Sequence, residues 1–387
     1  MTIEQSLLIG AIKASVCGVP VVPDGEPDWN SVIKLANMHG LSAMVYDGLQ
    51  KSNVPIPEMI ARFLSSSYMQ AVFRDAQQEY LKKQLQTALE EANIKHIFLK
   101  GSVLKADYPV PALRTMCDLD VLVYAADFDR IANVAKALGG EAMPGDGNHR
   151  NFVFLGGVSV EFHPNLLHHA TPIGTGINPG WQYAKETASS AMELTEEGFY
   201  LNTICHLANH FVAGGVGVRF VLDVWVNRHL RKPEADRAFV EAELTRFGLL
   251  DFARKIEQLA DAWFGEQPMS PLLEELGEYI LTSGSHGIAD RAMLNAMSLS
   301  PGGNQLSALM KKAFYPREEL EDRFPWCKGK PLLLPAAWCA RAYNAVTQHG
   351  SIIVNWGKGT SKISKTDVIE NQEKLRRFGI RKISKQK

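Results

Sequence analysis

Apolar residues recur at helical spacing over the first quarter of the chain. Leu7, Leu8 and Ala11 follow a 3.6-residue stripe, which is typical of a helix with one buried face. A longer helical pattern covers residues 57–92, with room for one break. We therefore expect an N-terminal helical region over residues 1–92.

Short apolar runs replace this pattern after residue 93, and turn residues separate them. The predicted elements are, in chain order, a strand at residues 96–100, a helix at 103–107, a strand beginning at Asp118, a helix at 127–138, and strands at 152–155 and 158–162. The last two strands flank Gly156 and Gly157, which indicates a β-hairpin. We therefore expect residues 93–170 to form a small α/β core.

Helical stripes return from about residue 197 and continue to about residue 347. We expect a C-terminal helical domain over residues 171–350, which makes the chain an α+β protein with helical regions before and after its sheet. Residues 351–387 differ in composition, because they hold ten Lys or Arg against three Asp or Glu. A basic tail of this kind is usually solvated, with contact to nucleic acid or acidic lipid as the alternative.

The bulk composition is that of an ordinary globular protein. The chain has 387 residues, of which 46% are hydrophobic and 21% charged, and its net charge of −1 argues against nucleic-acid binding by the molecule as a whole. Five scattered cysteines form no Cys-Xaa-Xaa-Cys pair, which argues against a disulfide framework or a zinc site. With no signal peptide and no apolar run long enough for a membrane span, we expect a cytoplasmic protein.

Two carboxylates stand two residues apart at Asp118 and Asp120. Residues i and i+2 of a strand share one face, so these residues would lie roughly 6.5 Å apart at ~3.3 Å per residue. Leu119, Val121 and Val123 then point to the other face, into a core. The carboxylates repel each other and call for a cation, and Mg²⁺ fits because it binds one or two carboxylates together with substrate phosphates. The pair therefore predicts phosphoryl or nucleotidyl chemistry.

Three further features lie in the same part of the chain. Gly101 and Ser102 separate a strand from a helix, where glycine lets the backbone approach a phosphate and N–H groups point at it. Glu161 interrupts a β-branched run, and because a buried unpaired carboxylate is costly, it either faces water or shares a cation. Arg114 suits bidentate phosphate contact, with a structural salt bridge as the alternative.

Taken together, these features resemble the nucleotidyltransferase fold of the DNA polymerase β superfamily. The order is strand, GlySer turn, helix, AspXaaAsp strand and a later strand with one acid. The stretches LeuLysGlySer, LeuArgThrMetCysAspLeuAspValLeuVal and ValGluPheHisPro look more closely like one bacterial branch, the uncharacterised nucleotidyltransferase family of the NTP_transf_5 type, from about residue 28 to about residue 345. The resemblance implies a small mixed β-sheet core embedded between helical regions.

The resemblance also implies the chemistry. Asp118, Asp120 and Glu161 would bind two divalent metal ions, Mg²⁺ or Mn²⁺. A substrate hydroxyl would attack the α-phosphorus of ATP or another nucleoside triphosphate, Glu161 or Asp120 would accept its proton, and pyrophosphate would leave. Because like charges repel, we expect raised pKa values at these carboxylates.

By the same resemblance, Gly101 and Ser102 form the phosphate turn. The chain departs from the compact superfamily motif in the 17 positions that separate Gly101 from Asp118. The extra residues are expected to form a loop over the site, which makes Lys100 and Arg114 phosphate clamps and puts the reach of Ser102 in question.

Five other residues are secondary candidates. His163 shares a strand face with the third carboxylate and either orients a ligand or bonds to backbone. His206 and His210 have the i, i+4 spacing of a zinc pair, but no HisGluXaaXaaHis is present, so a pair lining the cleft is expected. Arg219 and Asp223 have the spacing of a structural ion pair, and the resemblance also allows them to face the nucleotide or acceptor.

The leading hypothesis is a Mg²⁺-dependent transferase that moves NMP, with AMP as the first choice, to a hydroxyl of a small molecule, peptide or protein. A non-catalytic nucleotide-binding or scaffold protein is the alternative from another class, and three mutually repelling carboxylates argue against it. A transferase that uses a nucleotide-activated sugar would need the same metals. Nucleic acid enters as a partner only through the basic tail.

Overall fold

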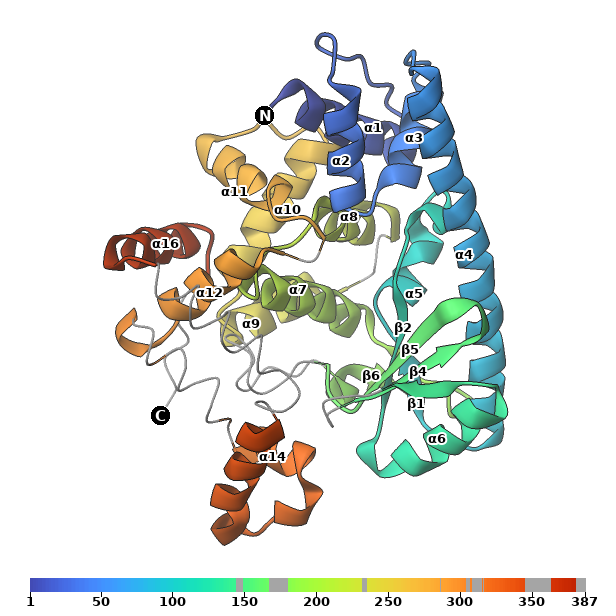
Figure 1. Ribbon diagram of the computed structural model, residues 1–387, viewed down its shortest axis with the longest axis vertical. Helices are drawn as coiled ribbons and strands as arrows, with labels where there is room; N and C mark the ends of the chain where they lie inside the picture. Colours follow the sequence, from blue (N-terminus) through green and yellow to red (C-terminus); the bar gives the residue numbers. More distant parts are fainter. Residues whose placement is uncertain are drawn as a thin grey trace.

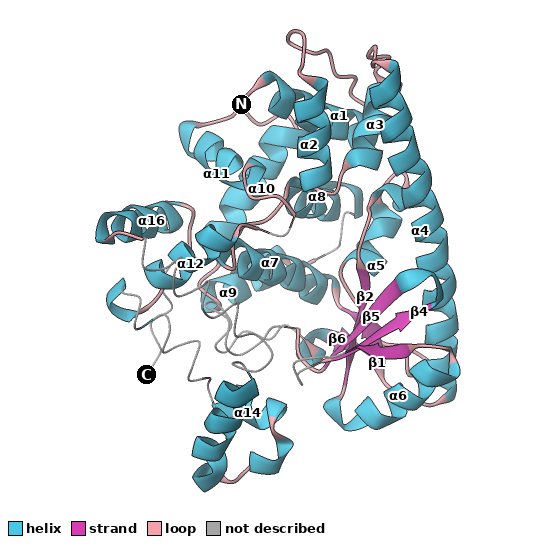
Figure 2. Ribbon diagram, in the orientation of Figure 1, coloured by secondary structure: helices cyan, strands magenta, loops and turns pink. Residues whose placement is uncertain are grey.

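Helices precede and follow one small mixed β-sheet along the chain (Figures 1 and 2). The computed structural model describes residues 1–143, 149–166, 180–231, 235–285, 287–303, 307, 315, 317–344 and 363–380. The α+β fold class predicted from the sequence is confirmed.

The N-terminal region is helical, as the spacing of its apolar residues predicted. Its helices are α1 (Ile3–Cys17), α2 (Trp29–Met38), α3 (Ser42–Lys51) and α4 (Glu58–Glu91). Helix α4 runs unbroken for 34 residues, because no glycine or proline interrupts it, and it flanks one whole side of the molecule (Figure 1). Leu64 packs with the N-terminal helices while Leu81 and Leu85 pack against the sheet, so α4 joins two hydrophobic cores.

The sheet has five strands in the order β1-β2-β5-β4-β3. Their bounds are β1 (His96–Phe98), β2 (Asp118–Val123), β3 (Glu141–Met143), β4 (Arg150–Phe154) and β5 (Val158–His163). Strands β2 and β5 pair in parallel and the other neighbours pair antiparallel. The short helix α5 (Gly101–Leu104) follows β1, and α6 (Phe128–Ala137) follows β2. The parallel pair is the feature that positions the site, because it sets Asp120 opposite Glu161.

The alternation of side chains along β2 gives its two faces different environments. Leu119, Val121 and Val123 are fully buried in a core shared with α4 and α6. Asp118 and Asp120 point to the opposite face, as the two-residue period of a strand requires. The apolar face thus fixes the register that exposes the acids to the site.

The C-terminal helices are α7 (Glu196–Val212), α8 (Val218–Val226), α9 (Arg237–Arg246), α10 (Leu250–Phe264), α11 (Pro271–Leu281), α12 (Ala289–Ser298), α14 (Arg317–Arg323) and α16 (Lys365–Arg377). Helices α7 to α11 and α16 share one core with the N-terminal helices, whereas α12 and α14 bury residues in two smaller clusters. A two-stranded ribbon, β6 (Ala184–Lys185) and β7 (Glu193–Leu194), precedes α7. No helix in the described ranges is long and apolar enough to cross a membrane.

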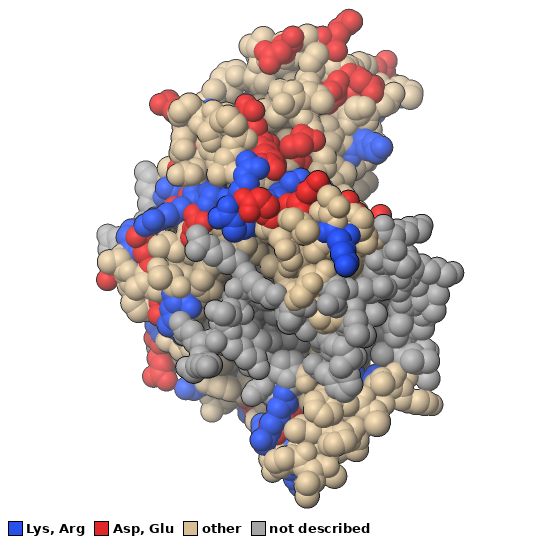
Figure 3. Space-filling model, turned by 90° about the vertical axis from the view of Figure 1, so that its left-hand side faces the viewer, with Lys and Arg blue, Asp and Glu red and all other residues tan. Residues whose placement is uncertain are grey.

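Part of the basic tail is folded, so the expectation of a solvated tail is wrong for residues 363–380. Asn371 on α16 donates to Asn295 Oδ1 and Ser298 Oγ at 3.0 and 2.9 Å, and Phe378 is fully buried. This segment carries four basic and three acidic side chains, a net +1. Figure 3 accordingly shows both charge signs side by side on the face that includes α16. The rest of the tail lies outside the described residues.

A buried histidine joins the N-terminal helices to the C-terminal helices. His39 has no solvent exposure, its Nδ1 accepts from the Val218 N–H at 3.3 Å, and its Nε2 donates to the Leu281 carbonyl at 3.1 Å. Acceptance at Nδ1 requires the neutral ring, because a protonated imidazole donates from both nitrogens. Burial lowers the pKa of His39 from 6.5 to about 4, even though the bond to Leu281 opposes this shift.

Because the folded pKa lies below the unfolded one, His39 favours folding fully above pH 6.5 and loses this contribution as the pH falls toward 4. We predict that the wild-type advantage over His39→Gln in free energy of unfolding shrinks by about 2 kcal/mol between pH 7 and pH 5. Urea unfolding of both proteins at both pH values measures this difference. An advantage that stays constant with pH would contradict the assignment.

Candidate active site

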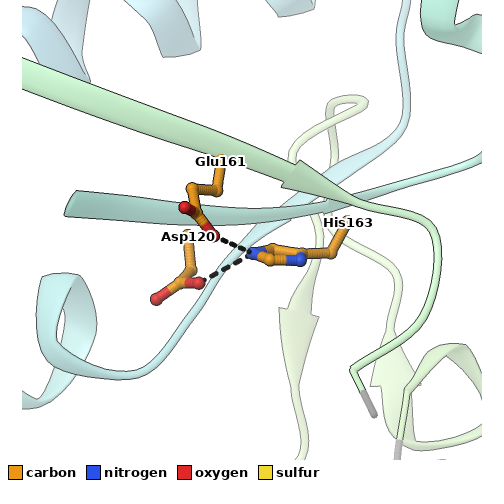
Figure 4. Close-up of side chains that lie close together, drawn as sticks. All are labelled: Asp120, Glu161 and His163. Carbon is orange, nitrogen blue, oxygen red and sulfur yellow. Dashed lines mark hydrogen bonds and ion pairs between the residues drawn. The ribbon is translucent and has the colours of Figure 1, made fainter. Parts of the chain in front are cut away.

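Four polar side chains from β2 and β5 gather on one face of the sheet. Asp118 and Asp120 come from β2, and Glu161 and His163 come from β5. The parallel register pairs Asp120 with Glu161, so these two carboxylates face the same side directly across the two strands. Figure 4 shows Asp120, Glu161 and His163 turned toward one another.

Asp120 is the most strongly bound member of this group. Its Oδ1 accepts from Lys100 Nζ and from His163 Nε2, each at 2.8 Å, and His163 Nε2 also lies 3.4 Å from Glu161 Oε2. Ligand atoms of Asp120, Glu161 and His163 lie within 4.8 Å of one another. The two carboxylates offer the oxygen ligands that suit a divalent ion such as Mg²⁺ or Mn²⁺, so they fit such a metal. The imidazole is not a usual ligand of these ions, and it donates to Asp120. Asp118 lies outside this tightest group but lines the same cavity.

The two aspartates of the AspXaaAsp pair have opposite electrostatic environments. Burial first, and then the neighbouring carboxylates of Asp120 and Glu161, raise the pKa of Asp118 to about 6. Burial would also raise the pKa of Asp120, but Lys100 and His163 outweigh it and hold this pKa well below its usual range. The expectation of raised values is therefore correct in direction for Asp118, although burial is its largest cause, and wrong for Asp120.

Lys100 reaches Asp120 from an unusual backbone conformation. Its φ of 52° and ψ of −126° belong to a region that glycine adopts readily and other residues avoid, because a Cβ crowds the backbone there. Strained residues of this kind persist where the surrounding structure holds them, often at functional sites. At Lys100 this backbone conformation turns the chain sharply between β1 and α5.

A cavity of about 260 Å³ covers the acidic face. Lys100, Gly101, Asp118, Asp120 and Glu161 line it on the side of the sheet. Helices α7 and α8 form the opposite wall, with Thr203, His206, His210, Arg219, Phe220 and Asp223. The site therefore lies between the sheet and the C-terminal helices.

Arg114 lines the cavity and is held by Asp223 of helix α8. Its Nε and Nη2 donate to Asp223 at 3.1 and 2.6 Å, and Tyr108 donates to Asp223 Oδ1 at 2.6 Å. All three side chains are buried. The connection between α5 and β2 is thus packed against α8 through Tyr108 and Arg114, and its residues Arg114, Met116 and Cys117 line the cavity. The structural salt bridge, left open by the sequence, is the arrangement observed.

Gly101 is required by this packing. A Cβ added at Gly101 would lie 2.1 Å from Arg114 Nη1, so only glycine lets the guanidinium lie against the turn. Ser102 is buried, and its hydroxyl donates to the Leu99 carbonyl at 2.7 Å. It lines a separate cavity behind α5, so its hydroxyl is already engaged away from the acidic face. A phosphate role for Ser102 and Arg114 stays a prediction that this geometry does not favour.

Of the secondary candidates, His206 and His210 lie in the cavity wall formed by α7 and α8. The Nε2 atoms of His206 and His210 are 3.0 Å apart, and both rings pack near Phe220. Within the described residues, no third ligand joins them in a metal-binding group. Burial lowers the pKa of His206 well below its usual value, which favours the neutral ring. They line the cleft, as expected.

Arg219 does not form the expected hydrogen-bonded ion pair with Asp223, because Arg114 and Tyr108 occupy that carboxylate. Its Nη1 donates to the Thr115 carbonyl at 2.7 Å, and the side chain lines the cavity. Arg219 is thereby a cation of the cavity wall with donors to spare. The sequence missed Thr203 and Phe220, although Thr203 lies three residues before His206 and helical spacing alone places it on the same face.

Comparison with known families gives one clear result. The family model described as "Uncharacterised nucleotidyltransferase" matches residues 25–265. The chain belongs to this family. The match contains every candidate residue and ends before the expected boundary near residue 345. No curated protein and no solved structure matches the chain. Membership in a nucleotidyltransferase family supports nucleotidyl transfer as the general reaction class.

The strained backbone at Lys100 reverses the usual order of stability between a glycine and an alanine variant. Lys100→Gly and Lys100→Ala both remove the ammonium, but only glycine relieves the backbone, so we expect the glycine variant to be about 1 kcal/mol more stable. At the exposed helical residue Lys136, the glycine variant should instead be about 1 kcal/mol less stable than the alanine variant. Denaturant unfolding of the four variants measures both differences. The same sign at both positions would show that Lys100 is not strained.

The buried pair of Arg114 and Asp223 leads to a second prediction. Asp223→Asn leaves the Arg114 guanidinium charged and buried without its partner, so we expect a loss of about 3 kcal/mol in free energy of unfolding. Glu58→Gln, which breaks the solvent-exposed pair with Arg62, should change stability little. Thermal or urea unfolding compares the two. Equal, small losses would contradict a structural role for Asp223.

Proposed function

We propose that this protein is a Mg²⁺- or Mn²⁺-dependent nucleotidyltransferase that moves NMP, with AMP as the first hypothesis, from a nucleoside triphosphate to a hydroxyl group. The acceptor is a small molecule, a peptide or a protein. One observation carries the proposal: Asp118, Asp120 and Glu161 converge from two parallel strands on a cavity in a chain of a nucleotidyltransferase family.

The carboxylates of Asp118, Asp120 and Glu161 would hold the divalent ions, with His163 fixing the orientation of Asp120 through its hydrogen bond. When bound, such ions neutralise phosphate charge and stabilise the attacking and leaving oxygens. The fit rests on the donor set, because oxygen ligands on one face of the sheet are what Mg²⁺ and Mn²⁺ prefer.

The phosphates would be bound by the cations that line the cavity. Lys100 and Arg219 both line it, from the sheet side and from α8 respectively, and an anionic triphosphate would fit between them. Gly101 lines the same cavity, where the Arg114 guanidinium fills the space that a side chain would take. Arg114 contributes indirectly, since its pairing with Asp223 holds the turn against α8.

In the proposed reaction the acceptor hydroxyl oxygen forms a bond to the α-phosphorus while the bond from that phosphorus to pyrophosphate breaks. The hydroxyl proton passes to a carboxylate of the site. Glu161 suits this task, because its carboxylate lines the cavity. Asp120 suits it poorly, because its Oδ1 already accepts from Lys100 and His163.

The proposal is tested with nucleoside triphosphates labelled at the α-phosphate, incubated with Mg²⁺ or Mn²⁺ and with cell extract as the acceptor source. Asp118→Asn should reduce transfer at least about 100-fold, because it removes a carboxylate that would hold the metal ions. It should also raise the free energy of unfolding, by up to about 3 kcal/mol at pH 7, because it removes a charge that is desolvated and is repelled by Asp120 and Glu161.

The matched control is Asp129→Asn, which removes an exposed carboxylate from α6 and should leave transfer unchanged. Transfer that survives Asp118→Asn would refute the site. Nucleotide binding without any transfer would favour a non-catalytic nucleotide-binding protein. Transfer of a labelled sugar from a nucleotide sugar would favour a sugar transferase.

A further inference from the structure

The carboxylate at the centre of the site already carries a cation supplied by the chain. Lys100 Nζ and His163 Nε2 both donate to Oδ1 of Asp120 at 2.8 Å, and no hydrogen bond occupies Oδ2 among the described residues. The side chains of Lys100 and Asp120 are 21% and 9% exposed, so water screens this pair poorly. The ammonium therefore neutralises the aspartate that the proposed function assigns to a metal.

The backbone at Lys100 indicates that its side chain has a specific use. A turn with φ of 52° and ψ of −126° would be served best by glycine, and the next residue in the chain is one. Lysine at this position costs stability, and the cost is consistent with a task for the ammonium rather than for the backbone. Lys100 also lines the cavity, and Arg219 lines it from the opposite wall.

We propose that Lys100 is an exchangeable counter-ion, whose ammonium pairs with Asp120 in the free protein and moves to the phosphates when a nucleotide and its metal ion enter together. This inference rests on the proposed function and deepens it. It predicts that a divalent ion alone binds weakly, because Lys100 competes with it for Asp120, and that the two ligands strengthen each other's binding.

Electrostatics sets the size of the effect. Charges of +1 and +2 on the two oxygens of one carboxylate lie within about 5 Å, and even in water their repulsion corresponds to about tenfold in affinity. Binding of a triphosphate gives the ammonium a new partner and removes this repulsion. Coupling of this kind is reciprocal, so the nucleotide should tighten the metal by the same factor as the metal tightens the nucleotide.

The test measures Mn²⁺ binding to the full chain by electron paramagnetic resonance, without nucleotide. Lys100→Met removes the charge and keeps the length of the side chain, and Lys100→Gly provides a second variant with a relaxed backbone. Both should bind Mn²⁺ at least about tenfold more tightly than wild type. Lys100→Arg keeps the charge and Lys95→Met removes an exposed lysine elsewhere, so both should bind as wild type does. Only binding that Asp120→Asn abolishes is counted.

The second arm measures inorganic tripolyphosphate binding at saturating Mn²⁺, which avoids any choice of base. Lys100→Met should bind it at least about tenfold more weakly than wild type, because the phosphates lose a cationic partner. Mn²⁺ binding that is unchanged or weaker in both Lys100→Met and Lys100→Gly would overturn the counter-ion role while leaving the metal site intact. If wild type and every Lys100 variant lack Mn²⁺ binding that depends on Asp120, the proposed function fails as well.

Discussion

The parallel pairing of β2 with β5 is the constraint on which the rest of the site depends. It places Asp120 directly opposite Glu161, with Asp118 and His163 on the same face. Carboxylates this close together repel each other, and nearby cations offset this repulsion more strongly at Asp120 than at Asp118. Lys100 and His163 stabilise the charge on Asp120, while Asp118 is left with a raised pKa. One strand register thus gives the two aspartates opposite electrostatic environments.

The surroundings of the sheet convert this face into an enclosed site. Helix α4 supports the other face through Leu81 and Leu85, which fixes the register. On the site's side, Asp223 of α8 binds Arg114 and Tyr108 from the connection that follows α5. A buried ion pair contributes little net stability by itself, but its loss would leave an unpaired charge, so it specifies how α8 meets the sheet. This junction forms the cavity wall that carries Arg219.

Local patterns in the sequence predicted much of this arrangement. The two-residue period placed Asp118 and Asp120 on one face opposite Leu119 and Val121. The helical pattern over residues 57–92 predicted the long helix α4, although the break that was allowed for is absent. Within residues 96–162 the predicted strands and helices are close to those observed, except that strand β3 (Glu141–Met143) was not predicted. These features depend on neighbours in the chain, which a sequence displays directly.

Features that depend on distant residues could not be read in the same way. The partner of Arg114 lies 109 residues away, so no local spacing identified Asp223, and the i, i+4 spacing pointed instead to Arg219. The pairing of Lys100 with Asp120 depends on the turn at Lys100. The positive φ of this turn is not expected for a lysine, so the sequence did not predict it. The tail was judged by its charge, whereas Val368, Leu375 and Phe378 bury part of it. In this segment, tertiary packing rather than local charge determines whether the side chains are buried.

Asp118, Asp120 and Glu161 are proposed to form one metal-dependent nucleotide site. The sharpest test is anomalous X-ray diffraction from crystals soaked with Mn²⁺ and a non-hydrolysable nucleoside triphosphate analogue. We expect manganese peaks within about 2–2.5 Å of carboxylate oxygens from these residues, with the triphosphate extending toward Arg219. Manganese bound elsewhere, with these three carboxylates free of metal, would refute the site.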